Sequence, residues 1–189
     1  MSYCAVIKAM KDGEQKQLHQ HYHDNWYGFP LHNDNELFGR FVLEIFQAGL
    51  SWNTILQKEE NFKKAFDNFD ILKIAAYDDL KIESLLENAG IIRNRLKINS
   101  VIYNANIVLG LQKDFGSFEK WLDFHHPLSL QDWVKLFKKT FKFTGSEIVN
   151  EFLMSVSYLP GAHEEHCPEF EKIKQLNAKW LEQDKNIKH

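Results

Sequence analysis

Apolar side chains recur at helical spacing through most of the chain. The clearest case follows Asn33, where apolar residues occupy the i, i+1, i+4 and i+5 positions of one broad helix face. These residues are Leu37, Phe38, Phe41, Val42, Ile45 and Phe46. Asn33 and Glu36 have the spacing of a capping box, so they predict where the helix begins. Gly49 is predicted to end it, and Ser51 to cap the next helix.

The same periodicity continues almost to the C-terminus. It predicts helices within residues 55–66, 71–77, 81–90, 91–113, 118–122, 133–141 and 146–159. No segment of any length alternates with the period of a strand, and there is no internal repeat. We therefore expect an all-α protein, a bundle of many short helices forming a single domain over residues 1–189. Residues from about 170 to 189 read as a polar tail that frays.

Composition narrows the class of protein. Of the 189 residues, 44% are hydrophobic and 26% are charged, the balance of a soluble globular protein. No apolar run has the length of a membrane span or a signal peptide, so we expect a cytoplasmic protein. The net charge of −3 does not indicate nucleic acid, although a local basic stripe is sufficient to bind phosphates.

The segment LLENAGIIRNRLKI, residues 85–98, is the most informative local pattern. A helix ends at Gly90, two apolar residues follow, and a basic helix begins. The unpaired amides at such a turn, starting at Gly90 and Ile91, suit a phosphate. Arg93, Arg95 and Lys97 would add side-chain charge on the same side. Such a helix–hairpin–helix would bind DNA phosphates without reading the sequence. The alternative, which the spacing alone favours, is an ordinary helix turn with a glycine C-cap and exposed basic residues. The apolar pair after the glycine and the RxRxK run are an argument for the first.

A second pattern contains metal-ligating side chains. GAHEEHC places His163 and Cys167 four residues apart, and Cys4 with a histidine of HQHYHD would complete a Cys₂His₂ set. Thiolate and imidazole are the ligands that Zn²⁺ prefers, and a closed set of four implies a structural site. Such a site would join the two ends of the chain. Spacing alone does not choose among the histidines, and a single HxxxC also arises by chance.

Glu44 is the third feature that requires a choice. At 100° per residue it falls just outside the apolar face, between Leu37 and the polar side occupied by Arg40 and Gln47. Helix geometry alone therefore favours a solvated carboxylate at the edge of the face. The functional alternative is a carboxylate at the lip of a pocket, near Trp52.

Six motifs in one order resemble a known family. They are a cysteine near the N-terminus, YHDNWYG, LEIFQAGLSW, NAGIIRNRLKI, FKFTG and HEEHC. From Cys4 to Cys167, the chain resembles DNA-3-methyladenine glycosylase I, in the helix–hairpin–helix superfamily. The resemblance implies a compact multi-helix fold whose terminal segments are joined by one structural zinc ion, bound by Cys4, His23, His163 and Cys167.

The resemblance also implies a function. It places Glu44 as the catalytic residue and Tyr22, Gln47 and Trp52 in a pocket for a base flipped out of double-stranded DNA. The expected enzyme is a monomeric, monofunctional glycosylase that hydrolyses the N-glycosidic bond of 3-methyladenine and starts base excision repair. The rival interpretation is a non-catalytic helix–hairpin–helix protein that binds DNA and carries a structural zinc.

The chain departs from the family pattern at its N-terminal end. The stretch from Cys4 to His23 is several residues longer, and AVI replaces a tryptophan that often follows the cysteine. His19 lies where a pocket tyrosine often occurs. Asp114 has roughly the placement of an aspartate that other branches use, but it reads more simply as a surface residue at a helix end.

Overall fold

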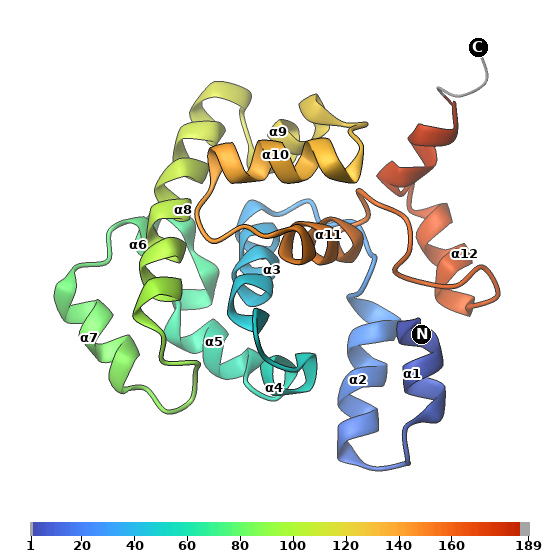
Figure 1. The fold of residues 1–189 in the computed structure, drawn as a ribbon, viewed down its shortest axis with the longest axis horizontal. Helices are drawn as coiled ribbons and strands as arrows, with labels where there is room; N and C mark the ends of the chain where they lie inside the picture. The colour runs from blue at the N-terminus through green and yellow to red at the C-terminus, as the bar shows by residue number, and fades with distance from the viewer. Residues whose placement is uncertain (1, 186–189) are drawn as a thin grey trace. The chain divides into compact units, whose positions relative to one another are not determined.

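A computed structural model describes residues 2–185, and its regular elements within that range are all helices, as predicted (Figure 1). The chain divides into two compact units. One is residues 32–149, and the other combines residues 1–31 with residues 150–189. The single domain predicted for residues 1–189 stays a prediction.

The unit of residues 32–149 is built around two helices, α3 (Asp34–Gln47) and α8 (Arg95–Phe115). The other elements of this unit are α4 (Trp52–Leu56), α5 (Glu59–Ala65), η1 (Asp67–Phe69), α6 (Ile71–Ala75), α7 (Asp79–Glu87), α9 (Phe118–His125) and α10 (Leu130–Thr140). Both α6 and α9 pack against α8. One helix predicted within 55–66 is in fact two, α4 and α5, with a break at Gln57 and Lys58.

Helix α3 begins and ends as its sequence predicts. The Asn33 side chain accepts hydrogen bonds from the amides of Asn35 and Glu36 at 2.9 and 3.2 Å. Ser51 caps α4 by accepting from the Thr54 amide. Every residue from Leu37 to Phe46 is buried, so α3 has no solvated side over these three turns. Its burial makes it a rigid element on which to place a functional side chain.

The core of this unit is aromatic. Phe46 packs on Phe62 and Phe66, with ring centroids 4.7 and 5.7 Å apart. A second cluster joins α3 to α9, α10 and the residue after α10; its members are Phe41, Phe118, Trp121, Phe137 and Phe141. Most of the phenylalanines therefore stabilise the fold by burying large apolar surfaces.

The second unit contains α1 (Tyr3–Ala9), α2 (Glu14–Asn25), α12 (Pro168–Gln175) and η2 (Lys179–Lys185). Helix α11 (Ser146–Ser155) starts in the first unit and ends in this one. The polar tail expected from about residue 170 is instead ordered through α12, because Ile173 and Ala178 are buried. The last part of that tail, residues 186–189, lies outside the described residues.

The hairpin lies between α7 and α8 (Figure 1). Helix α7 ends at Glu87, and α8 begins only at Arg95, four residues later than the pattern suggested. The delay has a local cause: the Asn94 side chain caps α8 by accepting from the Lys97 amide at 3.1 Å. Leu85, Ile91 and Ile98 form the apolar contact of the hairpin and are buried. Within the described residues, none of the helices has the length and apolar character needed to cross a bilayer.

Candidate functional site

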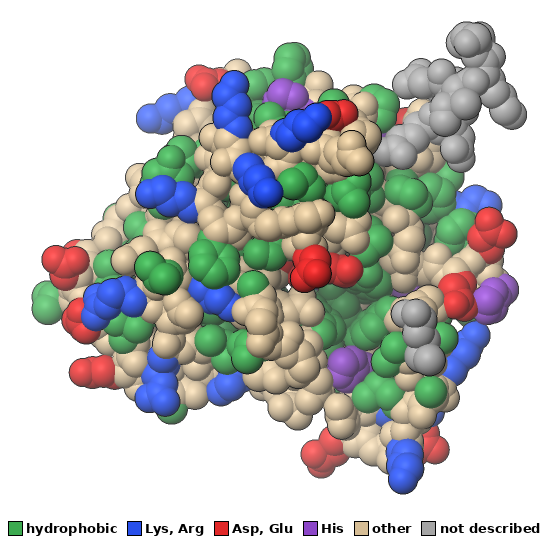
Figure 2. Space-filling model, in the orientation of Figure 1, with side chains coloured by type: hydrophobic (Ala, Val, Ile, Leu, Met, Phe, Trp, Pro, Cys, Tyr) green, Lys and Arg blue, Asp and Glu red, His purple; other side chains and the backbone are tan. Residues whose placement is uncertain are grey.

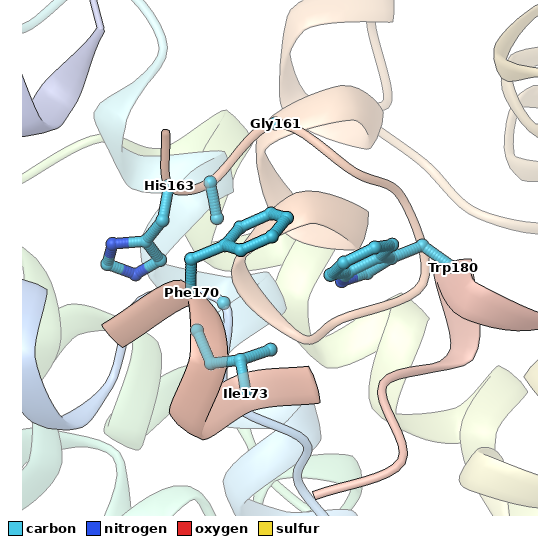
Figure 3. A pocket seen from close by; sticks show the side chains of 7 residues that line it. Gly161, His163, Phe170, Ile173 and Trp180 are labelled. Carbon is cyan, nitrogen blue, oxygen red and sulfur yellow. The ribbon is translucent and has the colours of Figure 1, made fainter. Parts of the chain in front are cut away.

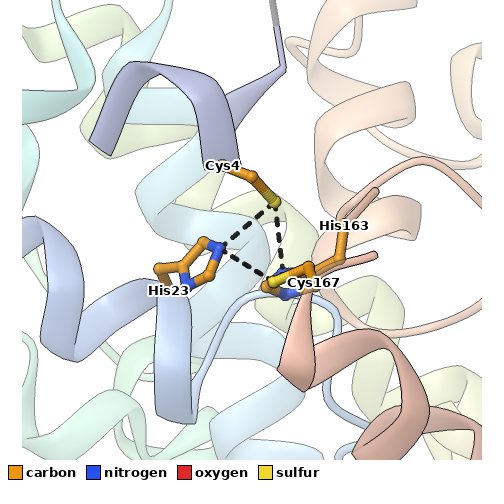
Figure 4. A group of neighbouring side chains, drawn as sticks. All are labelled: Cys4, His23, His163 and Cys167. Atoms are coloured by element: carbon orange, nitrogen blue, oxygen red, sulfur yellow. Dashed lines mark hydrogen bonds between the residues drawn. The ribbon is translucent and has the colours of Figure 1, made fainter. Parts of the chain in front are cut away.

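Four side chains predicted as metal ligands meet in the unit formed by the two chain ends (Figure 4). Cys4 comes from α1 and His23 from α2, whereas His163 and Cys167 lie in the loop before α12. The Cys4 sulfur lies 3.3 Å from His23 Nε2 and 3.7 Å from His163 Nδ1. The Cys167 sulfur lies 3.6 Å from His23 Nε2 and 3.5 Å from His163 Nδ1. All four residues are buried.

These separations fit one tetrahedral metal ion. With Zn–S near 2.3 Å and Zn–N near 2.0 Å, tetrahedral angles place sulfur and nitrogen about 3.5 Å apart. The four observed S···N distances lie on both sides of that value. Two thiols and two imidazoles with no fifth position for a substrate form a closed, structural kind of site. The group can therefore hold a metal ion.

Neighbouring groups orient both imidazoles towards the centre of the site. His23 Nδ1 lies 2.6 Å from Asp24 Oδ1, and His163 Nε2 donates to the Tyr27 carbonyl at 2.7 Å. Each contact leaves the other ring nitrogen facing the thiols, as outer partners of metal-bound histidines do. Burial lowers the pKa of His163, which favours the neutral imidazole that a metal requires. Burial also raises the pKa of the Cys167 thiol to about 12, so it is a thiol unless a cation is bound.

Gly28, in the YHDNWYG motif, allows the chain to pass close to the metal-binding loop. Its φ is +82°, and a Cβ there would lie 2.7 Å from the Ala162 Cβ and 3.3 Å from a His163 ring carbon. Its amide donates to the Ser155 carbonyl at 2.9 Å. Only glycine combines this backbone conformation with this approach. The motif therefore positions the loop as well as supplying His23.

The C-terminal segment packs beside the same loop (Figure 3). A small cavity next to His163 is bordered by Gly161, Phe170, Ile173 and Trp180. The Phe170 and Trp180 rings are in tilted contact with centroids 5.4 Å apart, and the Trp180 amide donates to the Ser157 carbonyl at 3.2 Å. This segment thus adds an apolar cover beside His163.

Three of the predicted base-pocket residues belong to the end of α3 and the start of α4. Glu44 is only 3% exposed, so the solvated edge favoured by helix geometry is wrong. Gln47 is the last residue of α3 and is half-buried, and Trp52 opens α4 and is also half-buried. Between them the chain turns at Gly49, with φ +82°. A buried carboxylate such as that of Glu44 is suited to binding a cation.

Tyr22, the fourth predicted pocket residue, belongs to the other unit and lies on α2. It is buried among aromatic rings, with centroids 6.0 Å from Tyr3 and 5.5 Å from Tyr27. His19, one turn earlier, is buried as well, and its Nδ1 lies 2.7 Å from the Tyr3 hydroxyl. These rings give α2 an aromatic face.

The hairpin amides are used differently from the prediction. The Gly90 amide donates to the Asn88 side chain at 2.8 Å, and the Ile91 amide donates to the Asn88 carbonyl at 3.3 Å. Among the described residues, no backbone carbonyl accepts from the amides of Ile92 and Arg93. The exposed donors of the turn are therefore shifted towards Arg93. Arg93 and Arg95 are both exposed, and Arg95 forms an ion pair with Glu83 at 2.7 Å.

Lys97 is not on the exposed side of the hairpin. It is only 5% exposed, and its ammonium donates to the carbonyls of Phe46 and Ala48 at 2.9 and 2.6 Å. The prediction that it binds phosphate is corrected for this reason. Its side chain leaves the face of α8 that carries Arg95 and binds the end of α3.

Comparison with known proteins identifies the family. The family model described as methyladenine glycosylase matches residues 12–133, which is more than half of the chain. The chain belongs to the methyladenine glycosylase family. DNA-3-methyladenine glycosylase 1 of Escherichia coli (strain K12) is 36% identical in an alignment of 163 residues, and 75% of this chain and 86% of that protein are covered.

Solved structures agree with this methyladenine glycosylase assignment. A 3-methyladenine DNA glycosylase I from Staphylococcus aureus, described for its recognition of 3-methyladenine, has a TM-score of 0.76 and 28% identity; 89% of this chain and 97% of that chain are covered. A variant 3-methyladenine DNA glycosylase I in complex with 3-methyladenine has the same TM-score and 29% identity, with 89% and 97% covered.

Sequence reasoning missed two partners of the metal-ligating histidines and the burial of Lys97. Asp24 stands next to His23, so its contact with that imidazole had a signal in the motif. The contact of His163 with the Tyr27 carbonyl had no signal in the sequence, because every residue has a main-chain carbonyl. The burial of Lys97 was hidden by its place in the basic RxRxK pattern, which is typical of an exposed surface.

Proposed function

We propose that this chain is a monofunctional DNA glycosylase that removes 3-methyladenine from alkylated double-stranded DNA. The observation that carries the proposal is the burial of Glu44 at the end of α3, in a chain of the methyladenine glycosylase family. The Escherichia coli relative is named for this activity, and the Staphylococcus aureus relative is described as recognising this base.

The chemistry of the lesion accounts for these residue types. Alkylation at N3 gives adenine a formal positive charge, which an aromatic face attracts. A carboxylate in a pocket that excludes water adds a charge-assisted contact. We assign base recognition to Tyr22, Gln47 and Trp52, each on its position in a family motif.

Glu44 has the central role in this proposal. The alkylated base is already a good leaving group, so strong general-acid catalysis is unnecessary. The Glu44 carboxylate binds the charged base and stabilises positive charge as the N-glycosidic bond breaks. The electron pair of that bond goes to the base, which leaves as neutral 3-methyladenine. Water adds its hydroxyl group to the sugar carbon and releases its other proton to solvent, and the DNA keeps an abasic site.

DNA phosphates are assigned to the hairpin. The amides at the turn and the Arg93 guanidinium provide donors that read no sequence. Arg95 joins them by exchanging its exposed ion pair with Glu83 for a phosphate, which costs little because such surface pairs are weak. Figure 2 shows further basic side chains over α10, where Lys135, Lys138 and Lys139 are exposed, so local positive charge exists despite the net charge of −3.

We propose zinc as the metal of the Cys₂His₂ group. The donor atoms and their spacing suit Zn²⁺, and the closed set assigns it to structure rather than to the reaction. When bound, the ion holds both cysteines as thiolates and joins α1 and α2 to the loop before α12. We further propose that the protein acts as a monomer in the bacterial cytosol.

The proposed function is tested by incubating the protein with DNA methylated by a simple alkylating agent. Chromatography should show free 3-methyladenine, and the DNA should carry abasic sites that break only on alkaline treatment. Binding of the duplex with no release of any base would favour a non-catalytic DNA-binding protein and overturn the proposal.

A further inference from the structure

Lys97 joins the two functional parts of its unit, although it faces neither solvent nor the hairpin surface. It is the third residue of α8, directly after the hairpin, and is 5% exposed. Its ammonium donates to Phe46 O at 2.9 Å and Ala48 O at 2.6 Å. A buried lysine is costly unless its charge is well solvated by the protein, so this placement calls for a function.

The two carbonyls lie where α3 needs partners. The last carbonyls of a helix lack intrahelical donors and carry the negative end of the helix dipole. Helix α3 has no basic residue in its own last turn. The Gln47 carbonyl accepts from the Leu50 amide at 2.7 Å, and Lys97 satisfies the carbonyls on either side. A cation from α8 therefore completes the cap of the helix that carries Glu44.

The other end of Lys97 is fixed by the hairpin. Its amide donates to the Asn94 side chain at 3.1 Å, and its carbonyl accepts from the Ser100 hydroxyl at 2.7 Å. Asn94, the N-cap of α8, directly follows Arg93. One residue thus contacts the phosphate-binding turn through its main chain and the end of α3 through its side chain.

A second loop contacts the ammonium through an aromatic ring. The Phe143 ring centroid lies 5.7 Å from Nζ, in the FKFTG motif. Asn104 of α8 holds this loop through two hydrogen bonds with the Lys142 main chain, at 3.0 and 2.8 Å. Phe143 has a φ of +60°, a conformation that a bulky residue adopts only when its surroundings impose it. The ring face of Phe143 therefore gives the ammonium a cation–π contact in addition to its two hydrogen bonds.

A buried lysine with a lowered pKa is also the kind of group that forms imines with sugars. The contacts of Lys97 instead favour a structural role. The Lys97 amine donates both of its hydrogen bonds to main-chain carbonyls of the protein, and the residue is 5% exposed. Lys97 is therefore a donor to the protein frame.

We propose that Lys97 is a positioning residue that fixes the distance between the phosphate-binding hairpin and the end of α3, so that a base whose flanking phosphate is held at the hairpin reaches Glu44 in reactive register. The inference rests on the proposed function. The positioning role makes different predictions for binding and for reaction. Replacing Lys97 should not change the affinity for duplex DNA or for free 3-methyladenine, but it should lower the rate at which the base is released from DNA.

The test replaces Lys97 by methionine, which keeps the volume but removes every donor. Three measurements are made: single-turnover release of 3-methyladenine with enzyme in excess, affinity for an undamaged duplex, and calorimetric affinity for free 3-methyladenine. For Lys97→Met, a loss of reactive register should slow release by about tenfold to a hundredfold. Both affinities should stay within about threefold of the parent, since each partner is bound separately.

Two further variants complete the test. Lys113→Met makes the same change at an exposed position of α8 and should react at the parent rate. Lys97→Arg keeps the positive charge and several donors, and should recover most of the rate. Recovery by arginine supports the role even if Lys97→Met does not fold.

The outcomes distinguish the inference from the function on which it rests. A parent protein that releases no base overturns both. An active parent with an equally active Lys97→Met overturns only the positioning role. The positioning role is also wrong if Lys97→Met loses affinity for free 3-methyladenine in proportion to its loss of rate. It is wrong as well if Lys97→Arg folds and binds duplex DNA but releases base no faster than Lys97→Met. If Lys97→Met does not fold, a Lys97→Arg variant slowed tenfold or more contradicts the role.

Discussion

At the scale of single residues, a few polar side chains hold the turns on which the site depends. Asp67, Asn68 and Phe69 form η1 with φ values of +51°, +58° and +57°. Left-handed residues in succession are costly unless contacts enforce them. The Tyr77 hydroxyl donates to Asp67 at 2.5 Å, and the Lys81 ammonium lies 3.1 Å from the same carboxylate. These two contacts fix the turn that packs against α3.

This turn predicts a pH-dependent contribution to stability. The hydrogen bond from Tyr77, together with Lys81, holds the pKa of Asp67 below its usual range. A lowered carboxyl pKa stabilises the fold above the ordinary value of about 3.9, and the contribution is lost as pH falls through the native pKa. Tyr77→Phe should therefore cost about 1 kcal/mol near pH 7, a modest amount because the carboxylate is partly exposed.

Urea denaturation of parent and Tyr77→Phe at pH 7 and below pH 3 measures this difference. The gap between their free energies of unfolding should shrink at the lower pH. A gap of the same size at both pH values would show that Tyr77 acts through packing and not through the carboxylate.

At the scale of elements, α3 is held against its neighbours by close packing. A Cβ on Gly39 would lie 2.5 Å from a ring carbon of Phe69, so α3 and η1 meet where only glycine fits. Alanine normally favours a helix over glycine by about 1 kcal/mol. At Gly39 the clash should dominate, and Gly39→Ala should cost about 1–3 kcal/mol.

Gly110→Ala is the matched control, because it lies within α8 and its Cβ would meet nothing within 4 Å. It should leave stability unchanged or raise it by up to about 1 kcal/mol. Urea denaturation measures both stability changes from the shift in midpoint, provided that the variants and the parent have the same dependence of unfolding free energy on urea. If Gly39→Ala is as stable as Gly110→Ala, the contact between α3 and η1 is looser than described.

The hairpin predicts how DNA binding responds to salt. Arg93→Ala should weaken binding to all duplexes alike, since phosphate contacts carry no sequence information. It should also reduce the slope of log affinity against log salt by about 1, as expected for one phosphate contact. Fluorescence anisotropy over a range of salt concentrations measures the slope, and a slope equal to that of the parent would remove Arg93 from the phosphate contact.

The elements also show which features the sequence could predict. Helix α3 and its Asn33 cap followed from local patterns, because caps and periodicity depend on neighbours in the chain. The contacts of Lys97 and the burial of Glu44 did not, because they depend on which helices lie around α3. Helix geometry placed Glu44 at a solvated edge, and only the family motifs indicated a buried role.

At the scale of the whole molecule, the metal group joins the chain's two ends into one unit. Cys4 and His23 come from residues 1–31, and His163 and Cys167 from the C-terminal part. Metal binding is coupled to folding in such small units, because the ligands meet only in the folded state. Spacing could not choose among the histidines, whereas the structure brings His23 to the cysteines.

Metal analysis should find about one zinc per chain in the parent, the occupancy that a four-ligand structural site predicts. His163→Ala should lose zinc and lower the thermal midpoint, with faster hydrogen exchange in residues 2–31 and 150–182. His166→Ala changes an exposed histidine of the same motif and should keep the metal. Equal zinc content in both variants would contradict the ligand set.

The central claim is that the buried Glu44 carboxylate recognises the positive charge of the alkylated base. Its most direct test is the single-turnover rate of 3-methyladenine release by Glu44→Gln, which keeps the size of the side chain and removes the charge. With zinc content and duplex affinity equal to those of the parent, release should slow by about a hundredfold, the usual effect of losing one such electrostatic contact. Release at the parent rate would contradict the account.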